Sequence, residues 1–176
     1  MKKFILSLMA LSMFVAVGCS EESATDYNAA PAEEQNNLFG RSSVWNGVIG
    51  IEDNGLYKVT ADEAALMADL ETNLKREGHD TKLQTLEIVK KESANTPGDF
   101  GYMLVGADKV RTSIGVWLVR SNNQFTIDTG FTNSTSCTGC AMGCNLSYMT
   151  IDGKKLAYCN ENGCDYDCTK SETSVF

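Results

Sequence analysis

Cysteines are the feature of this sequence that most restricts its fold. Six of the seven lie near the C-terminus, in two triplets separated by a mostly apolar segment. Residues 146–151 and 154–158 of that segment flank Asp152-Gly153, a dipeptide typical of a tight β-hairpin turn. The sequence therefore predicts a hairpin with a cysteine cluster at each foot, and antiparallel pairing would bring the two clusters together. The six cysteines are Cys137, Cys140, Cys144, Cys159, Cys164 and Cys168.

Structural disulfides are the interpretation that we favour for these cysteines. An even number of thiols can pair completely, and disulfides persist in the oxidising compartments that exported proteins meet. The spacing does not select one connectivity among the many that six cysteines allow. On this interpretation the chain needs no cofactor.

Two other chemistries remain open for the same residues. A zinc site would use C-x2-C, the hairpin and C-x4-C, which resembles a zinc ribbon and leaves Cys144 and Cys168 to pair with each other. Its ligands would be Cys137, Cys140, Cys159 and Cys164. A redox centre would hold an iron–sulfur cluster or Cu(I), with Met142 and Met149 as soft donors, although no ferredoxin-type cysteine spacing is present.

The N-terminus has the pattern of an export signal. Lys2 and Lys3 precede an apolar run over residues 4–17, shorter than the about 20 residues that a membrane-spanning helix requires. The run ends in Ala16-Val17-Gly18-Cys19, which resembles the lipobox of bacterial lipoproteins, although Ala16 stands where leucine is usual. The resemblance implies that residues 1–18 are removed and that Cys19 carries palmitate-type lipid. It also implies attachment to the bacterial envelope, where we expect the outer membrane.

Residues 19–37 are predicted to be a lipidated acidic tether. Residues 20–37 carry five acidic and no basic side chains, with too little apolar surface to repay the entropy of ordering. Ser20-Glu21-Glu22 resembles the tag that directs some Bacteroidota-type lipoproteins to the cell surface.

Charge restricts the partners of the chain. Removal of Lys2 and Lys3 would leave 13 basic against 23 acidic residues, a net charge of −10. Such a surface repels nucleic acid and anionic lipid headgroups, so the lipid would provide the contact with the membrane.

Residues 38–132 are predicted to form an α+β domain in which one helix packs on an antiparallel sheet. The cysteine-rich β-hairpin module of residues 133–176 would follow it. Leu66, Leu70 and Leu74 give the helix one apolar stripe, Thr60 and Glu63 resemble a capping box, and Gly78 is a natural stop. Strands are expected near residues 44–51, 56–59, 83–89, 102–105, 113–119 and 124–128.

No group of residues in this sequence indicates catalysis. His79, the only histidine, follows the helix-ending glycine and is expected to be an exposed loop residue. Trp45 and Trp117 are expected in the core or half-buried in the sheet. The sequence therefore predicts a non-catalytic protein that binds an unidentified protein or small molecule or has a structural role.

Overall fold

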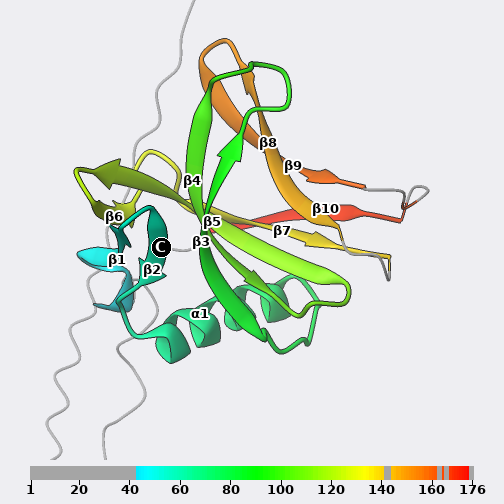
Figure 1. The fold of residues 1–176 in the computed structure, drawn as a ribbon. Coiled ribbons are helices and arrows are strands. Elements are labelled where there is room, and N and C mark those ends of the chain that lie inside the picture. Colours follow the sequence, from blue (N-terminus) through cyan, green and yellow to red (C-terminus); the bar gives the residue numbers. More distant parts are fainter. Residues whose placement is uncertain (1–42, 141–143, 162–163, 165–166, 175–176) are drawn as a thin grey trace, which may run out of the picture. The chain divides into compact units, whose positions relative to one another are not determined.

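The computed structural model describes residues 43–140, 144–161, 164 and 167–174 (Figure 1). The predicted signal segment, Cys19, the tether and Met142 lie outside these residues. All described residues belong to one compact unit that spans Asn36–Phe176. Its elements in chain order are η1 (Ser43–Trp45), β1 (Val48–Asp53), β2 (Leu56–Val59), α1 (Glu63–Arg76), β3 (Thr85–Glu92), β4 (Phe100–Ala107), β5 (Thr112–Ser121), β6 (Gln124–Ile127), β7 (Asn133–Thr138), β8 (Asn145–Ile151), β9 (Lys154–Asn160) and β10 (Thr169–Ser174).

The described residues form mostly antiparallel strands and one α-helix, the composition that an α+β fold requires. β5 is the central strand of an eight-stranded sheet. Along one edge it pairs with β4, and along the other it pairs with β7 and then with β6. β1 and β2 continue the sheet beyond β6, β3 lies outside β4, and β10 lies outside β7. The predicted segment 113–119, apolar on both faces, is therefore central as expected.

Two tight turns lie where the sequence predicts them. Asn54 and Gly55 join β1 to β2 with φ values of 53° and 79°. Asp152 and Gly153 join β8 to β9 with φ values of 50° and 74°. Two consecutive positive φ values match the twist of a two-residue hairpin, which is why glycine and short polar residues are favoured there.

Helix α1 ends as predicted but begins differently. Gly78 has a φ of 89°, and the amides of Gly78 and His79 bond back to Lys75 and Leu74, which closes the last turn. At the other end Asp62, and not Thr60, is the N-cap: its carboxylate accepts the amide of Ala65 at 3.1 Å. The amides of Thr60 and Ala61 both bond to the carbonyl of Ile49, so the chain stays attached to β1 and the helix starts later.

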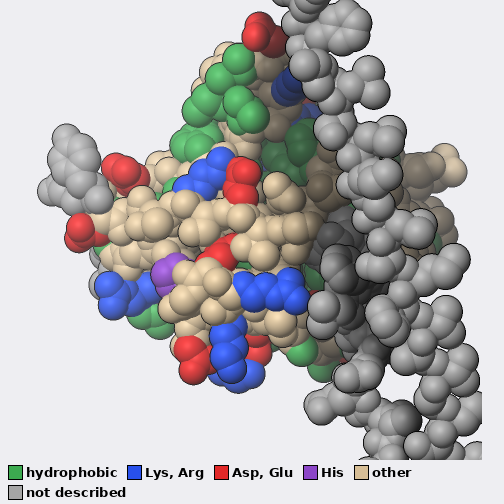
Figure 2. All heavy atoms as spheres, turned by 180° about the vertical axis from the view of Figure 1, so that it is seen from behind, with side chains coloured by type: hydrophobic (Ala, Val, Ile, Leu, Met, Phe, Trp, Pro, Cys, Tyr) green, Lys and Arg blue, Asp and Glu red, His purple; other side chains and the backbone are tan. Residues whose placement is uncertain are grey.

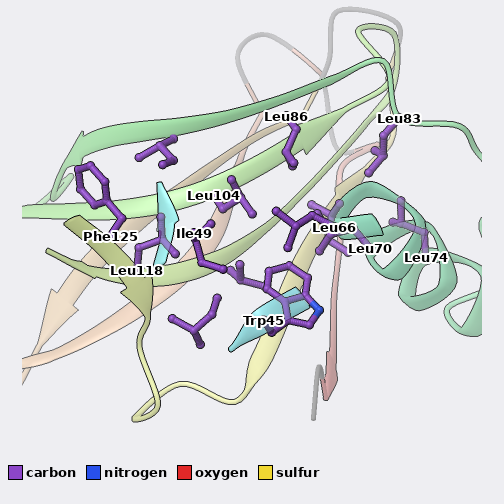
Figure 3. Packing of buried hydrophobic residues seen from close by; sticks show 14 residues of the cluster. Trp45, Ile49, Leu66, Leu70, Leu74, Leu83, Leu86, Leu104, Leu118 and Phe125 are labelled. Atoms are coloured by element: carbon purple, nitrogen blue, oxygen red, sulfur yellow. The ribbon is translucent and has the colours of Figure 1, made fainter. Parts of the chain in front are cut away.

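One apolar cluster contains the leucine stripe of α1 (Figure 3). Leu66, Leu70 and Leu74 are fully buried there, together with residues of η1, β1 and β3–β6. The cluster consists of Trp45, Ile49, Leu66, Leu70, Leu74, Leu83, Leu86, Ile88, Leu104, Ile114, Val116, Leu118, Phe125 and Ile127.

A second cluster lies on the other face of β4 and β5, because neighbouring residues of a strand point to opposite sides of the sheet. Leu104 and Val116 belong to the first cluster, whereas their neighbours Met103 and Trp117 belong to the second. The β8–β9 hairpin supplies most of the remaining residues. The second cluster consists of Met103, Trp117, Cys137, Cys144, Leu146, Tyr148 and Ala157.

The C-terminal residues are part of the main sheet. β7 pairs with β5 and β10 pairs with β7, so the predicted boundary between residues 132 and 133 runs through one sheet. Only the β8–β9 hairpin forms a separate two-stranded sheet. Hydroxyl-rich β7 and β10 therefore belong to the same sheet as the strands of residues 38–132, and the β8–β9 hairpin lies within residues 133–176 as predicted.

Candidate binding cleft

Three disulfides join the two cysteine triplets in order. They are Cys137–Cys159, Cys140–Cys164 and Cys144–Cys168, with Cα–Cα distances of 5.5 to 5.9 Å. The first links β7 to β9, and the last links the residue before β8 to the residue before β10. The disulfides therefore hold one end of the hairpin against the β7–β10 part of the sheet.

The zinc alternative requires four of these sulfurs as free thiolates. In the structure Cys137 pairs with Cys159 and Cys140 pairs with Cys164, and a disulfide sulfur is not the thiolate ligand that zinc takes. Among the residues that the structure describes, no group of three or more His, Cys, Asp or Glu could hold a metal ion. Met149, a donor in the redox alternative, is half-buried on β8.

Glycines let the hairpin approach the sheet closely. A Cβ atom on Gly115 would lie 2.4 Å from Leu146 Cδ2, and one on Gly101 would lie 3.4 Å from Tyr148 Cε1, and both neighbours belong to the hairpin. Any larger residue at Gly115 would push against the hairpin. Ser113 Oγ also donates a hydrogen bond of 2.9 Å to the Cys144 carbonyl, which fixes the start of β8.

The far end of the hairpin is tied to the turn between β3 and β4. The Tyr148 hydroxyl donates to the Asp99 carbonyl at 2.8 Å, and the Ala94 amide donates to the Tyr148 carbonyl at 2.9 Å. Asn95 exchanges two further bonds with the backbone of Thr150, each of 2.8 Å. Burial, and then the charges of Asp99 and Glu92, raise the pKa of Tyr148 to about 12, so its hydroxyl stays protonated as a donor.

A cleft of about 230 Å³ lies between the hairpin and the sheet. Trp117 from β5 and Phe131 from the β6–β7 connection form an apolar floor, with ring centres 5.5 Å apart. Lys155 and Leu156 of β9 and Glu172 of β10 are further lining residues. The remaining lining residues are Gly130, Thr132, Asn133, Thr135 and Ala157.

Charge in the cleft is balanced. The Lys155 ammonium lies 5.6 Å from the Trp117 ring centre and 5.7 Å from that of Tyr148, and it donates to the Phe100 carbonyl at 3.2 Å. Glu172 forms an ion pair of 2.6 Å with Lys170. The cleft offers an apolar surface with polar side chains around it.

A wider depression of about 460 Å³ contains His79, and several of its polar groups bond to one another. Figure 2 shows this face, where acidic and basic side chains lie near the imidazole. His79 is half-buried rather than exposed, with its Nε2 3.3 Å from Thr138 Oγ1. Arg111 Nε donates to the Gly139 carbonyl at 2.7 Å.

Asp108 shows how this depression is used within the fold. One of its carboxylate oxygens accepts three backbone amides of residues 110–112, and the other accepts the Thr81 hydroxyl. Burial alone would raise the pKa of Asp108, but these hydrogen bonds hold it below its usual value.

A third depression, of about 480 Å³, lies between β2 and β3.

Sequence reasoning found the cysteines and the hairpin but missed the cleft. Trp117 was expected in the core and is 4% exposed there. Nothing in the local sequence marked Phe131 or Glu172 as a lining residue. Each becomes part of the lining only because β7 pairs with β5 and β10.

Comparison with known proteins gives no match: no family model, no curated protein and no solved structure is significantly similar to this chain. Within the described residues, no helix has the length and apolar character that crossing a membrane requires. The function therefore has to be argued from the residues of the site.

Proposed function

We propose that this chain is a lipid-anchored bacterial envelope protein that binds a ligand non-catalytically in the cleft beneath its cysteine hairpin. Cys19 would carry the lipid, and residues 19–37 would hold the folded unit away from the outer membrane, on its surface-exposed side. The partner would be an exposed protein or small molecule and not nucleic acid.

The observation that carries the proposal is a hairpin fixed at both ends above a cleft. Three disulfides hold one end, and hydrogen bonds from Tyr148 and Thr150 hold the other. A preformed cleft loses little conformational entropy when a ligand enters, which favours binding. Both the disulfides and the predicted export signal are typical of proteins in an oxidising compartment outside the cytoplasm.

The proposed scaffold has three layers. Helix α1 would cover one face of the sheet and the β8–β9 hairpin the other. The two buried clusters support this arrangement, since one contains the leucines of α1 and the other contains residues of the hairpin.

Crosslinking in intact cells tests the binding role. A photoreactive phenylalanine analogue at Leu156, which is 46% exposed and lines the cleft, should give a crosslinked product. The same analogue at Leu56, 64% exposed beside the β1–β2 turn, is the matched control and should give none. Equal products at both positions, or none at Leu156, would contradict binding in the cleft.

The lipid anchor has a separate test. Cys19→Ala should abolish incorporation of labelled palmitate and release the protein from the membrane fraction. Unchanged labelling of that variant would disprove the lipid-anchor proposal.

A further inference from the structure

We infer that the cleft accepts one ring of a neutral saccharide, a ligand class that deepens the proposed function and rests on it. Three features of the cleft lead to this class: its aromatic floor, its paired donors and acceptors, and its balanced charge.

The floor offers an apolar surface of ring size. Phe131 is half-buried, and its ring is tilted by 38° against Trp117. Tyr148 meets Trp117 edge-on with the ring centres 5.1 Å apart. Trp117 is therefore a rigid support, and Phe131 presents the accessible aromatic surface. The C–H face of a sugar ring is apolar and can lie on such a surface.

The polar groups around the floor suit vicinal hydroxyls. Lys155 can only donate hydrogen bonds, Glu172 in its ionised form can only accept them, and Asn133 can do both. A sugar hydroxyl is both a donor and an acceptor, so adjacent hydroxyls on one ring can satisfy all three groups at once.

Charge and size narrow the class further. The lining carries one cation, Lys155, and one anion, Glu172, which also pairs with Lys170, so an ionic ligand meets like charge as well as opposite charge there. The chain has a net charge of −8, which repels anions at longer range. Pockets for drug-sized ligands measure about 300–1,000 Å³, whereas this cleft of about 230 Å³ holds a smaller group.

Saturation-transfer NMR on the purified mature chain tests the inference. The probes are methyl glycosides of neutral hexoses and of N-acetylhexosamine, with glucuronate and free amino acids as competing classes. We expect signals from at least one neutral glycoside and weaker or no signals from the charged probes. Stronger binding of a charged probe, or no binding of any neutral glycoside, would overturn the saccharide assignment.

Two cleft variants locate the binding. Phe131→Ala should weaken binding at least tenfold, and Glu172→Gln, a change at an exposed residue, should weaken it severalfold without affecting folding. Phe100→Ala is the matched control, since Phe100 is 43% exposed and lies outside the cleft lining. Glycoside binding that both cleft variants leave unchanged would place the sugar elsewhere and reject the inference.

Crosslinking at Leu156 separates this inference from the proposed function. A product at Leu156 without glycoside binding would reject the saccharide and keep the binding role. Absence of both would reject both.

Discussion

Helix α1 meets the rest of the protein through two kinds of contact, one apolar and one polar. The side chains of Leu66, Leu70 and Leu74 are buried in the apolar cluster, where they pack against other apolar side chains. The last turn instead meets hydroxyl groups of β7 and β10: Glu77 accepts hydrogen bonds from Ser136 and Thr173, and buried Asn73 contacts Ser134. One helix thus joins an apolar region to a polar one.

The same difference in side-chain chemistry separates the strands around the apolar cluster from β7 and β10. β7 and β10 have the sequences NSTSCT and TKSETS, which bury hydroxyl groups and little apolar surface. Burial contributes about 25 cal/mol per Å² of apolar area, so such strands gain little from it. All three disulfides lie in this region, and they compensate by restricting the unfolded chain.

Reduction of the disulfides should separate the two regions most strongly. They span 22, 24 and 24 residues, and closing a loop of that length contributes about 3 kcal/mol. Hydrogen exchange on the reduced, alkylated chain should show lost protection in β7–β10 and retained protection in β3 and β4. Equal loss in all strands would mean that the regions unfold as one.

Protein that has not been reduced tests the state of the cysteines. Untreated mature protein should offer no thiol of residues 137–168 to an alkylating reagent. Four or more reactive thiols after denaturation and metal removal would reject the disulfides and favour the zinc alternative.

Leu70→Ala should weaken the apolar region. Loss of a fully buried leucine costs about 2–5 kcal/mol in the free energy of unfolding, through lost burial and the cavity that remains. Urea denaturation measures this loss of stability. Leu56→Ala, at an exposed position, is the control and should stay within about 0.5 kcal/mol of wild type. A neutral Leu70→Ala would show that the stripe does not stabilise the fold.

Glu77→Gln should weaken the polar region by less. Hydrogen bonds to a charged group contribute about 1.5–3 kcal/mol, and glutamine keeps one acceptor oxygen for the two hydroxyl donors. We expect a loss of about 1–2 kcal/mol, with Glu87→Gln on the exposed surface of β3 as the control. If the two variants had the same free energy of unfolding, Glu77 would not stabilise the contact between the two regions.

The smallest effect concerns the start of the helix. Asp62→Ala should cost about 1 kcal/mol, because the Ala65 amide loses its partner. Thr60→Ala should stay within about 0.5 kcal/mol of wild type, because Thr60 contributes its backbone amide to Ile49 and no helix cap. If Thr60→Ala lowered the melting temperature more than Asp62→Ala did, Thr60 would be the N-cap after all.

Local sequence signals predicted the local structure. Asn54-Gly55, Asp152-Gly153 and Gly78 mark two turns and a helix end, because their positive φ values suit few residue types. The N-cap was missed by two residues, because a contact with β1, distant in sequence, delayed the helix. The anchor at Cys19 and the tether stay predictions.

Long-range pairing could not be predicted in the same way. β7 and β10 were not recognised as strands, since serine and threonine on both faces give no apolar alternation. The cleft depends on those strands, so Phe131 and Glu172 could not be recognised as its lining. The six cysteines were recognised, but their order of pairing was not, because spacing along the chain does not fix spacing across a fold.

The sequence by itself determined the turns, the leucine stripe, the hairpin and the presence of a cysteine cluster, because each depends on residues within a few positions of one another. Tertiary structure alone decided which cysteines pair, that β7 and β10 extend the main sheet, and that the hairpin crosses Trp117 to form a cleft. These features depend on contacts between residues 20 to 100 positions apart, as in the hydrogen bond from Thr173 to Glu77, 96 residues away. Such contacts must offset the entropy lost when the intervening chain is closed into a loop, and the local spacing of residues does not show which of them do so.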